Sequence, residues 1–327
     1  MIIFVVNALN LINYNSIMKK LIASVAALVV ALGAAYAQDL AAVTEIYNAG
    51  AEAVSAGDKA SALSSFEKAL EMAAALGEEG EEVVTNCKNI IPNLVLSMAK
   101  DLVKESKFDE AIAKLGDAAA VAEKYASEEV LEEAKELIPQ VKMSKAGNLL
   151  NAKEYDAAAA AYKEVLDADP ANGAAALRLG VALNGAGKLA EAKAAFETAA
   201  ANGQEATANK QLGNIYLKEA AAALKAKKYA DAVAAAVKVN DYTENAQAWQ
   251  IAGQASQLAS KNNDAIKYFE KYLEASPNAS NAGAIAYTVG ALYQQAKNNA
   301  KAKEYYTKAA SDPKYGAEAK KMLDALK

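Results

Sequence analysis

The chain has 327 residues and a formal net charge of −5, from 35 Lys and Arg against 40 Asp and Glu. It contains no His and one Cys, so imidazole catalysis, His-based zinc sites and intrachain disulfides are excluded. The acidic balance and the single arginine, Arg178, argue against a nucleic-acid binder, which needs a basic surface. The Ala-, Lys- and Glu-rich composition with five Pro predicts an all-helical protein.

The N-terminal region carries the pattern of a secretory signal. Met18-Lys19-Lys20 precedes an apolar run and a small-residue site that ends at Ala37. We therefore expect residues 1–37 to be an over-long start plus a signal peptide, with the true start at Met18 and cleavage after Ala37. The alternative is an uncleaved N-terminal membrane anchor that includes the apolar stretch at residues 2–6.

These features lead to an expectation about location. After signal cleavage no segment reaches the roughly 18 consecutive apolar residues of a spanning helix, so we expect no stable membrane span. The signal and the lack of disulfides predict an exported protein of a Gram-negative bacterium, periplasmic, outer-membrane-associated or secreted. Cys87 lies in a helical pattern and is expected to be a small apolar filler, with an interchain disulfide as the alternative.

Residues 249–277 contain the most specific pattern in the chain. Trp249, Gly253, Ala265, Phe269 and Pro277 follow one another at spacings that resemble the tetratricopeptide repeat (TPR), a helix–turn–helix unit of about 34 residues. The pattern predicts a first helix over 244–259 and a second over 263–275, with Asn263 as the cap of the second. The small residues let the two helix axes approach closely, and Phe269 fills the space between them.

The same skeleton recurs along residues 40–327. Gly290, Ala302 and Tyr306 give a second specific copy, and Gly180, Ala192 and Phe196 give a third. Seven central alanines recur at intervals of 49, 47, 34, 40, 33 and 37 residues: Ala62, Ala111, Ala158, Ala192, Ala232, Ala265 and Ala302. The resemblance implies an all-α, right-handed superhelical solenoid of about seven antiparallel helix pairs.

The long intervals predict elongated first helices. Related stretches around Pro92 and Pro139 suggest that two first helices extend backwards by three or four turns and are kinked or broken at these prolines. A motif at residues 212–216 lies two turns too far from Tyr229, so that first helix is also expected to be longer. We divide the solenoid, residues 38–327, into longer-period repeats over 38–168, regular repeats over 169–314 and a capping helix over 315–327.

In TPR proteins ligands usually lie along the groove formed by the first helices. In the repeat of Trp249, the outward face of the first helix carries Gln247, Gln250, Gln254 and Gln257 at helical spacing. Neighbouring first helices would add Lys210, Asn214, Tyr287 and Gln294. Amide groups suit the backbone of an extended peptide or the hydroxyls of a sugar, although glutamine is also a common solvent-facing residue in helices.

Lys210 and Asn214 also match the first pair of a clamp with which some TPR proteins bind a terminal carboxylate, but the rest of the clamp is missing. The repeat positions, Trp249 included, are expected to be structural.

The sequence therefore favours a non-enzymatic scaffold that binds another protein or peptide. We expect no catalytic residues, metal or cofactor, and the oligomeric state stays open. The first alternative is a periplasmic binder of glycan or peptidoglycan fragments with a Gln- and Tyr-lined groove. An enzyme without a recognisable motif and a structural spacer are two further alternatives.

Overall fold

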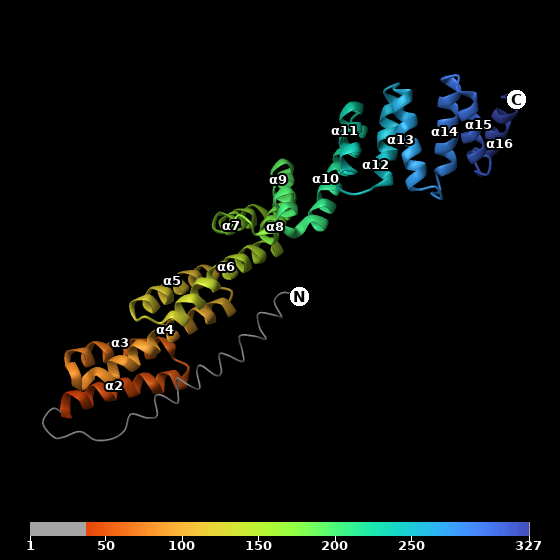
Figure 1. The fold of residues 1–327 in the computed structure, drawn as a ribbon. Coiled ribbons are helices and arrows are strands. Elements are labelled where there is room, and N and C mark those ends of the chain that lie inside the picture. The colour runs from red at the N-terminus through yellow and green to blue at the C-terminus, as the bar shows by residue number, and fades with distance from the viewer. Residues whose placement is uncertain (1–36, 327) are drawn as a thin grey trace. The chain divides into compact units, whose positions relative to one another are not determined.

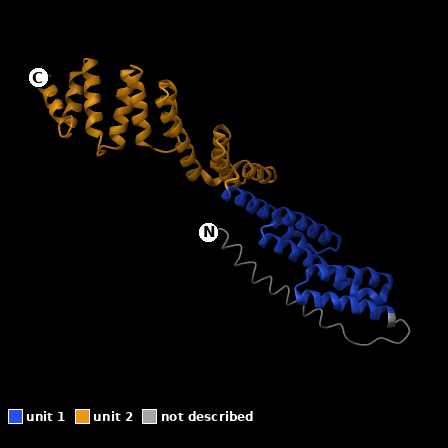
Figure 2. Ribbon diagram, turned by 180° about the vertical axis from the view of Figure 1, so that it is seen from behind, with its two compact units in different colours: residues 1–152 blue, residues 153–327 orange. Residues whose placement is uncertain are grey.

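The computed structural model describes residues 37–326, and all regular secondary structure within this range is helical. The predicted start at Met18, the signal segment and the alternative anchor lie outside the described residues. The chain divides into two compact units at residues 152 and 153 (Figure 2). The all-α fold of antiparallel helix pairs that the sequence predicts is confirmed in both units.

Unit 1 consists of long helices (Figure 1). They are α2 (Ala37–Ala56), α3 (Lys59–Ala75), a 3₁₀ turn η1 (Gly77–Gly80), α4 (Glu81–Lys104), α5 (Phe108–Lys124) and α6 (Glu128–Asn151). Helix α4 packs on α3, α5 and α6 and buries large aliphatic side chains on several sides, including Ile91, Leu94 and Val95. Cys87 is fully buried in this core, as a filler would be, and burial raises the pKa of its thiol to about 12.

Unit 2 is built mainly of shorter helices. They are α7 (Tyr155–Ala168), α8 (Gly173–Gly185), α9 (Leu189–Ala199), the connecting turn η2 (Ala200–Gln204), α10 (Glu205–Lys225), α11 (Tyr229–Val239), α12 (Ala246–Leu258), α13 (Asn262–Ala275), α14 (Ala282–Gln295), α15 (Asn299–Ala309) and α16 (Gly316–Ala325). Within this unit α8 pairs with α9, α10 with α11, α12 with α13 and α14 with α15.

The predicted elongated first helices are confirmed. Helices α4 and α6 have 24 residues and α10 has 21, against 13 or 14 in α8, α12 and α14. Of the predicted kink or break at Pro92 and Pro139, the break is wrong, because α4 and α6 run through these residues as single helices. A proline removes one backbone hydrogen bond, and the packing of a helix on its neighbours can compensate for that loss.

A buried pair of residues sixteen positions apart defines the repeat. The first member lies on the first helix and the second on the second helix. A Cβ atom added to Gly180, Gly253 or Gly290 would lie 2.5–2.8 Å from the ring of Phe196, Phe269 or Tyr306 respectively. These glycines are therefore needed for the close approach of the two helices, as predicted. The neighbouring alanines Ala192, Ala265 and Ala302 have no exposed surface.

The turn within each pair has a fixed form. A residue with positive φ lies nine positions before the second member of the buried pair, at Gly57, Ser106, Gly187, Lys227, Ser260 and Lys297. Most of these are not glycine, so the turn geometry is imposed by the packing of the pair at a cost of about 1 kcal/mol per residue. The predicted cap at Asn263 is wrong, since α13 begins one residue earlier, with Lys261 at the N-cap position.

Candidate binding surface

Helix α12 presents a row of amide side chains on one side. Asn245 starts the helix by accepting a hydrogen bond from the backbone N–H of Ala248 at 3.1 Å. The side that packs on neighbouring helices carries small or apolar residues, among them Ile251, Ala252 and Gly253. Because the glutamines fall between these positions in the helical repeat, they lie on the less covered side.

The side chains of the four glutamines reach solvent and are not engaged in side-chain hydrogen bonds within the described residues. Gln247 and Gln257 are exposed, and Gln250 and Gln254 are half-buried. Within residues 37–326 no side-chain hydrogen bond is found for any of these four amides. Next to Gln257 lies Leu258, whose side chain is 59% exposed, the largest exposure of a large hydrophobic residue in the described chain. We call Gln247, Gln250, Gln254, Gln257 and Leu258 the amide face.

On α14 the predicted groove residues already have contacts inside their repeat. The ring of Tyr287 lies 5.5 Å from that of Tyr306 and 5.4 Å from that of Tyr315. Gln294 accepts a hydrogen bond from the Tyr306 hydroxyl at 2.7 Å. Both residues are half-buried, and their assignment to a groove stays a prediction.

On α10 the structure changes which residues correspond to those of α12, and therefore where the predicted groove residues fall in the repeat. The buried pair of this repeat is Ala220 and Ala236, so Ala220 has the role that Gly253 has in α12. Gly213 instead makes room for Thr243, whose methyl carbon would lie 2.5 Å from an added Cβ. In the Ala220 register, Asn214 corresponds to Gln247, whereas Lys210 lies one turn further towards the N-terminus.

This register also affects the comparison with a carboxylate clamp. The match of Lys210 and Asn214 to the clamp used Gly213 as the counterpart of Gly253, whereas the buried pair gives that role to Ala220. Lys210 and Asn214 are both exposed.

Trp249 has a packing role at the contact of α12 with α13. Its ring stacks on Tyr268, with ring centroids 6.0 Å apart and planes inclined by 10°. The ammonium group of Lys271 lies 4.2 Å from the centre of the Trp249 ring. The tryptophan is only partly buried, in contrast to Phe269, which is 1% exposed.

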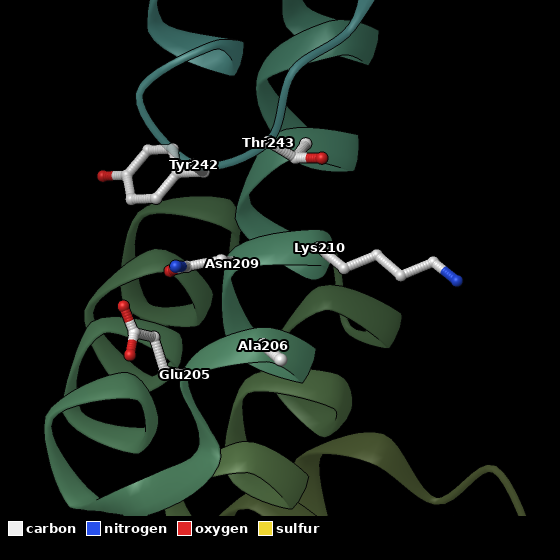
Figure 3. Close-up of a pocket in the computed structure, with 6 residues that line it drawn as sticks. All are labelled: Glu205, Ala206, Asn209, Lys210, Tyr242 and Thr243. Atoms are coloured by element: carbon white, nitrogen blue, oxygen red, sulfur yellow. The ribbon is translucent and has the colours of Figure 1, made fainter.

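A pocket of about 450 Å³ lies where α10 meets the connection between α11 and α12. Figure 3 shows Glu205, Ala206, Asn209 and Lys210 on the first turns of α10, below Tyr242 and Thr243 of the connection. Apart from Lys210, sequence reasoning did not identify these residues. The available signal was the misplaced motif at residues 212–216, which implied that α10 extends beyond its partner helix.

Aromatic and charged contacts hold Tyr242 in place. Its ring stacks on Tyr216 at 5.6 Å with planes inclined by 7°, and its hydroxyl donates to Glu197 of α9 at 3.3 Å. On α9, Lys193 lies 4.3 Å from the Tyr216 ring centre and pairs with Glu219 at 2.7 Å. Burial raises the pKa of Tyr242, so its hydroxyl stays protonated and able to donate.

Comparisons with known proteins agree with the helical-repeat architecture. Residues 149–212 match the family model described as tetratricopeptide repeat. No curated protein sequence matches the chain.

Three solved structures illustrate the likeness. MamA is 21% identical over 55% of this chain and 94% of its own, with a TM-score of 0.34. YrrB, described as a TPR protein with an unusual peptide-binding site, is 23% identical over 55% of this chain and 91% of its own, with a TM-score of 0.31. A tetratricopeptide repeat protein from Parabacteroides merdae is 15% identical over 88% of this chain and 99% of its own, with a TM-score of 0.27.

No described helix of this chain has both the length and the apolar character needed to span a bilayer.

Proposed function

From the premise that this chain is a tetratricopeptide repeat protein, we propose that it is a non-enzymatic interaction protein that binds an extended segment of a partner polypeptide on the amide face. The observation that carries this proposal is the row of four accessible glutamine amides without side-chain partners among the described residues. Each amide group offers both a donor and an acceptor, as a peptide backbone does.

The dimensions of the amide face suit a short extended peptide. Gln247 and Gln257 are ten residues apart on one helix, which corresponds to about 15 Å. An extended chain covers this distance with about four or five residues. Leu258 adds an apolar contact at one end, so we expect the bound segment to combine backbone hydrogen bonding with an apolar side chain.

Chemistry supports the non-enzymatic part of the proposal. The chain has no His, and its single Cys is buried with a raised thiol pKa, so a Cys–His nucleophile–base pair cannot form.

The peptide proposal can be tested by selection from a random dodecapeptide display library on the purified protein, followed by measurement of Kd for the enriched peptides. We expect Gln250→Ala combined with Gln254→Ala to weaken binding at least tenfold, because hydrogen bonds to the peptide backbone are lost. Gln140→Ala removes an exposed glutamine of α6 in unit 1 and is the control that should leave Kd unchanged.

Two outcomes would contradict the proposal. One is that no peptide is enriched; the other is that the double variant, folded as judged by circular dichroism, binds every enriched peptide as the parent protein does. Binding of the parent protein to a glycan array, lost in the double variant, would favour the alternative function as a glycan or peptidoglycan-fragment binder.

We further propose that the protein acts in the cell envelope after export. The support is the signal pattern at residues 18–37. N-terminal sequencing of the exported protein tests this, with Gln38 as the expected first residue; a chain that retains residues 1–37 in the membrane would instead support the anchor.

A further inference from the structure

The N-terminal part of α10 extends beyond its partner helix. Val239, the last residue of α11, lies beside Gly213, so the residues of α10 before Gly213 continue past the end of α11. Tyr242 and Thr243 cover this extension instead of a helix. The pocket is therefore a direct consequence of the two extra turns of α10.

One side of the pocket is lined by hydrogen-bond acceptors. In Figure 3 the side chains of Glu205, Asn209 and Tyr242 lie on the same side, with the carboxylate below and the aromatic ring above. Glu197 is not one of the lining residues, but it places a second carboxylate beside the pocket, since it accepts the hydrogen bond of the Tyr242 hydroxyl. Neither Glu197 nor Glu205 forms an ion pair with any residue in the described part of the chain.

The lysines near the pocket do not neutralise these carboxylates. Lys193 is paired with Glu219 at 2.7 Å, and Lys238 is paired with Asp241 at 2.9 Å. Lys210 lines the opposite side, and Figure 3 shows its side chain directed away from Glu205. A ligand on the Glu205 side therefore meets one carboxylate, an amide and a phenol ring, with the carboxylate of Glu197 at the hydroxyl of that ring.

This set of groups selects the ligand chemistry. Carboxylates repel anions, and burying them against an uncharged group leaves their charge unpaired. No group of three or more His, Cys, Asp or Glu placed to hold a metal ion is found between residues 37 and 326. An organic cation that donates several hydrogen bonds, such as a guanidinium or ammonium group, satisfies the acceptors.

The pocket lies on the connection that leads into the helix of the amide face. Lys210 precedes Asn214 by one helical turn on the same face of α10, and Asn214 is the counterpart of Gln247 in the next repeat. The connection that carries Tyr242 and Thr243 leads directly into α12.

We propose that this pocket binds a basic side chain, Arg or Lys, of the partner segment whose backbone lies on the amide face. This inference rests on the proposed function and adds that the bound partner segment contains a positively charged residue. It assigns Glu205 as the group that contacts the cation and Asn209 as an additional acceptor, with Glu197 as a second negative charge beside the pocket that is held by Tyr242.

The test uses the dodecapeptide selection with three proteins: the parent, Glu205→Gln and Glu274→Gln. Glu274 is an exposed residue of α13 for which no ion pair is found within the described range, so its variant has the same net charge as Glu205→Gln. We expect peptides enriched on the parent and on Glu274→Gln to share a basic residue at a fixed position, and this preference to be lost on Glu205→Gln. Replacing the shared Arg by the neutral isostere citrulline should weaken binding to the parent at least tenfold and to Glu205→Gln less than threefold.

The outcomes separate the two proposals. Peptides that bind through Gln250 and Gln254 but show no basic preference would overturn the pocket assignment and leave the proposed function standing. An equal loss of basic preference on Glu205→Gln and Glu274→Gln would overturn it as well, because it would reflect general attraction to a chain of net charge −5. If no peptide is enriched, both proposals fail.

Discussion

The first helices of the two units use the same helix-pair plan differently. In unit 1, α4 is covered on several sides by α3, α5 and α6, and its buried residues are large aliphatics. In unit 2, the buried residues of α12 are small or apolar, and the other side of the helix keeps its glutamines accessible. The comparison teaches that extra length on a first helix can serve burial, as in α4, or create a pocket, as in α10.

The largest effect on stability is expected from the removal of a buried aromatic ring in unit 2. Phe269→Ala should lower the free energy of unfolding by about 3–5 kcal/mol, because Phe269 fills the space beside Gly253. Since each repeat contacts mainly its neighbours, hydrogen exchange should accelerate in α12 and α13 and stay unchanged in α4 and α5. Equal acceleration in both units would mean that the two unfold as one cooperative body.

A smaller effect is expected from adding one methyl group to a glycine in each unit. In unit 2, Gly253→Ala places a Cβ 2.5 Å from the ring of Phe269 and should destabilise the protein by about 1–3 kcal/mol. In unit 1, Gly116 is exposed within α5 and has no atom within 4 Å of an added Cβ, so Gly116→Ala should stabilise by up to about 1 kcal/mol. Urea unfolding of both variants measures the difference, and a Gly253→Ala variant as stable as the parent would refute the close approach.

The smallest effect concerns tyrosine hydroxyls. In unit 1 the Tyr47 hydroxyl is buried and lacks a hydrogen-bond partner in the described residues, and burial, followed by Cys87 and Glu82, raises its pKa to about 12. In unit 2 the Tyr293 pKa is also raised to about 12, by burial and then by Glu270, to which its hydroxyl donates at 2.6 Å. Tyr47→Phe should therefore leave stability unchanged or raise it by up to about 1 kcal/mol, whereas Tyr293→Phe should lower it by about 1 kcal/mol.

The raised pKa of Tyr47 predicts how its contribution to the stability of the fold changes with pH. An unfolded tyrosine ionises near pH 10, and the folded Tyr47 near pH 12, so the unfolded state loses its proton first. The contribution of Tyr47 to stability is complete below pH 10 and declines as the pH rises towards 12. Thermal unfolding between pH 9 and 12 should show a shallower decline for Tyr47→Phe than for the parent; identical slopes would show that this hydroxyl reaches solvent.

Much of the fold was predictable from residue spacing, because the packing of each pair fixes a small residue and a large one at constant separation. Gly253 with Phe269 and Gly290 with Tyr306 illustrate this constant separation. The long intervals between successive central alanines indicated which first helices are elongated. The register of α10 was not predictable from a motif alone. Gly213 resembles Gly253 in the sequence, but it accommodates Thr243 of a connection rather than a ring of the second helix.

The candidate site was predictable only in part for a related reason. The glutamines of α12 follow from helical periodicity within a single element. The pocket depends on Glu205 and Tyr242, which are 37 residues apart and meet because of where one helix ends. Contacts of this kind leave no periodic trace in the sequence.

The fixed turn within each helix pair has a consequence for protein engineering. Because the positive-φ residue always lies nine positions before the second buried residue, these turns have no freedom in length, and an inserted epitope at Ser260 or Lys297 would displace a core ring. The connections between pairs differ in length and sequence, as in the segment that contains exposed Pro277 and Asn278. A fluorophore or affinity tag for following the protein in living cells belongs in that connection.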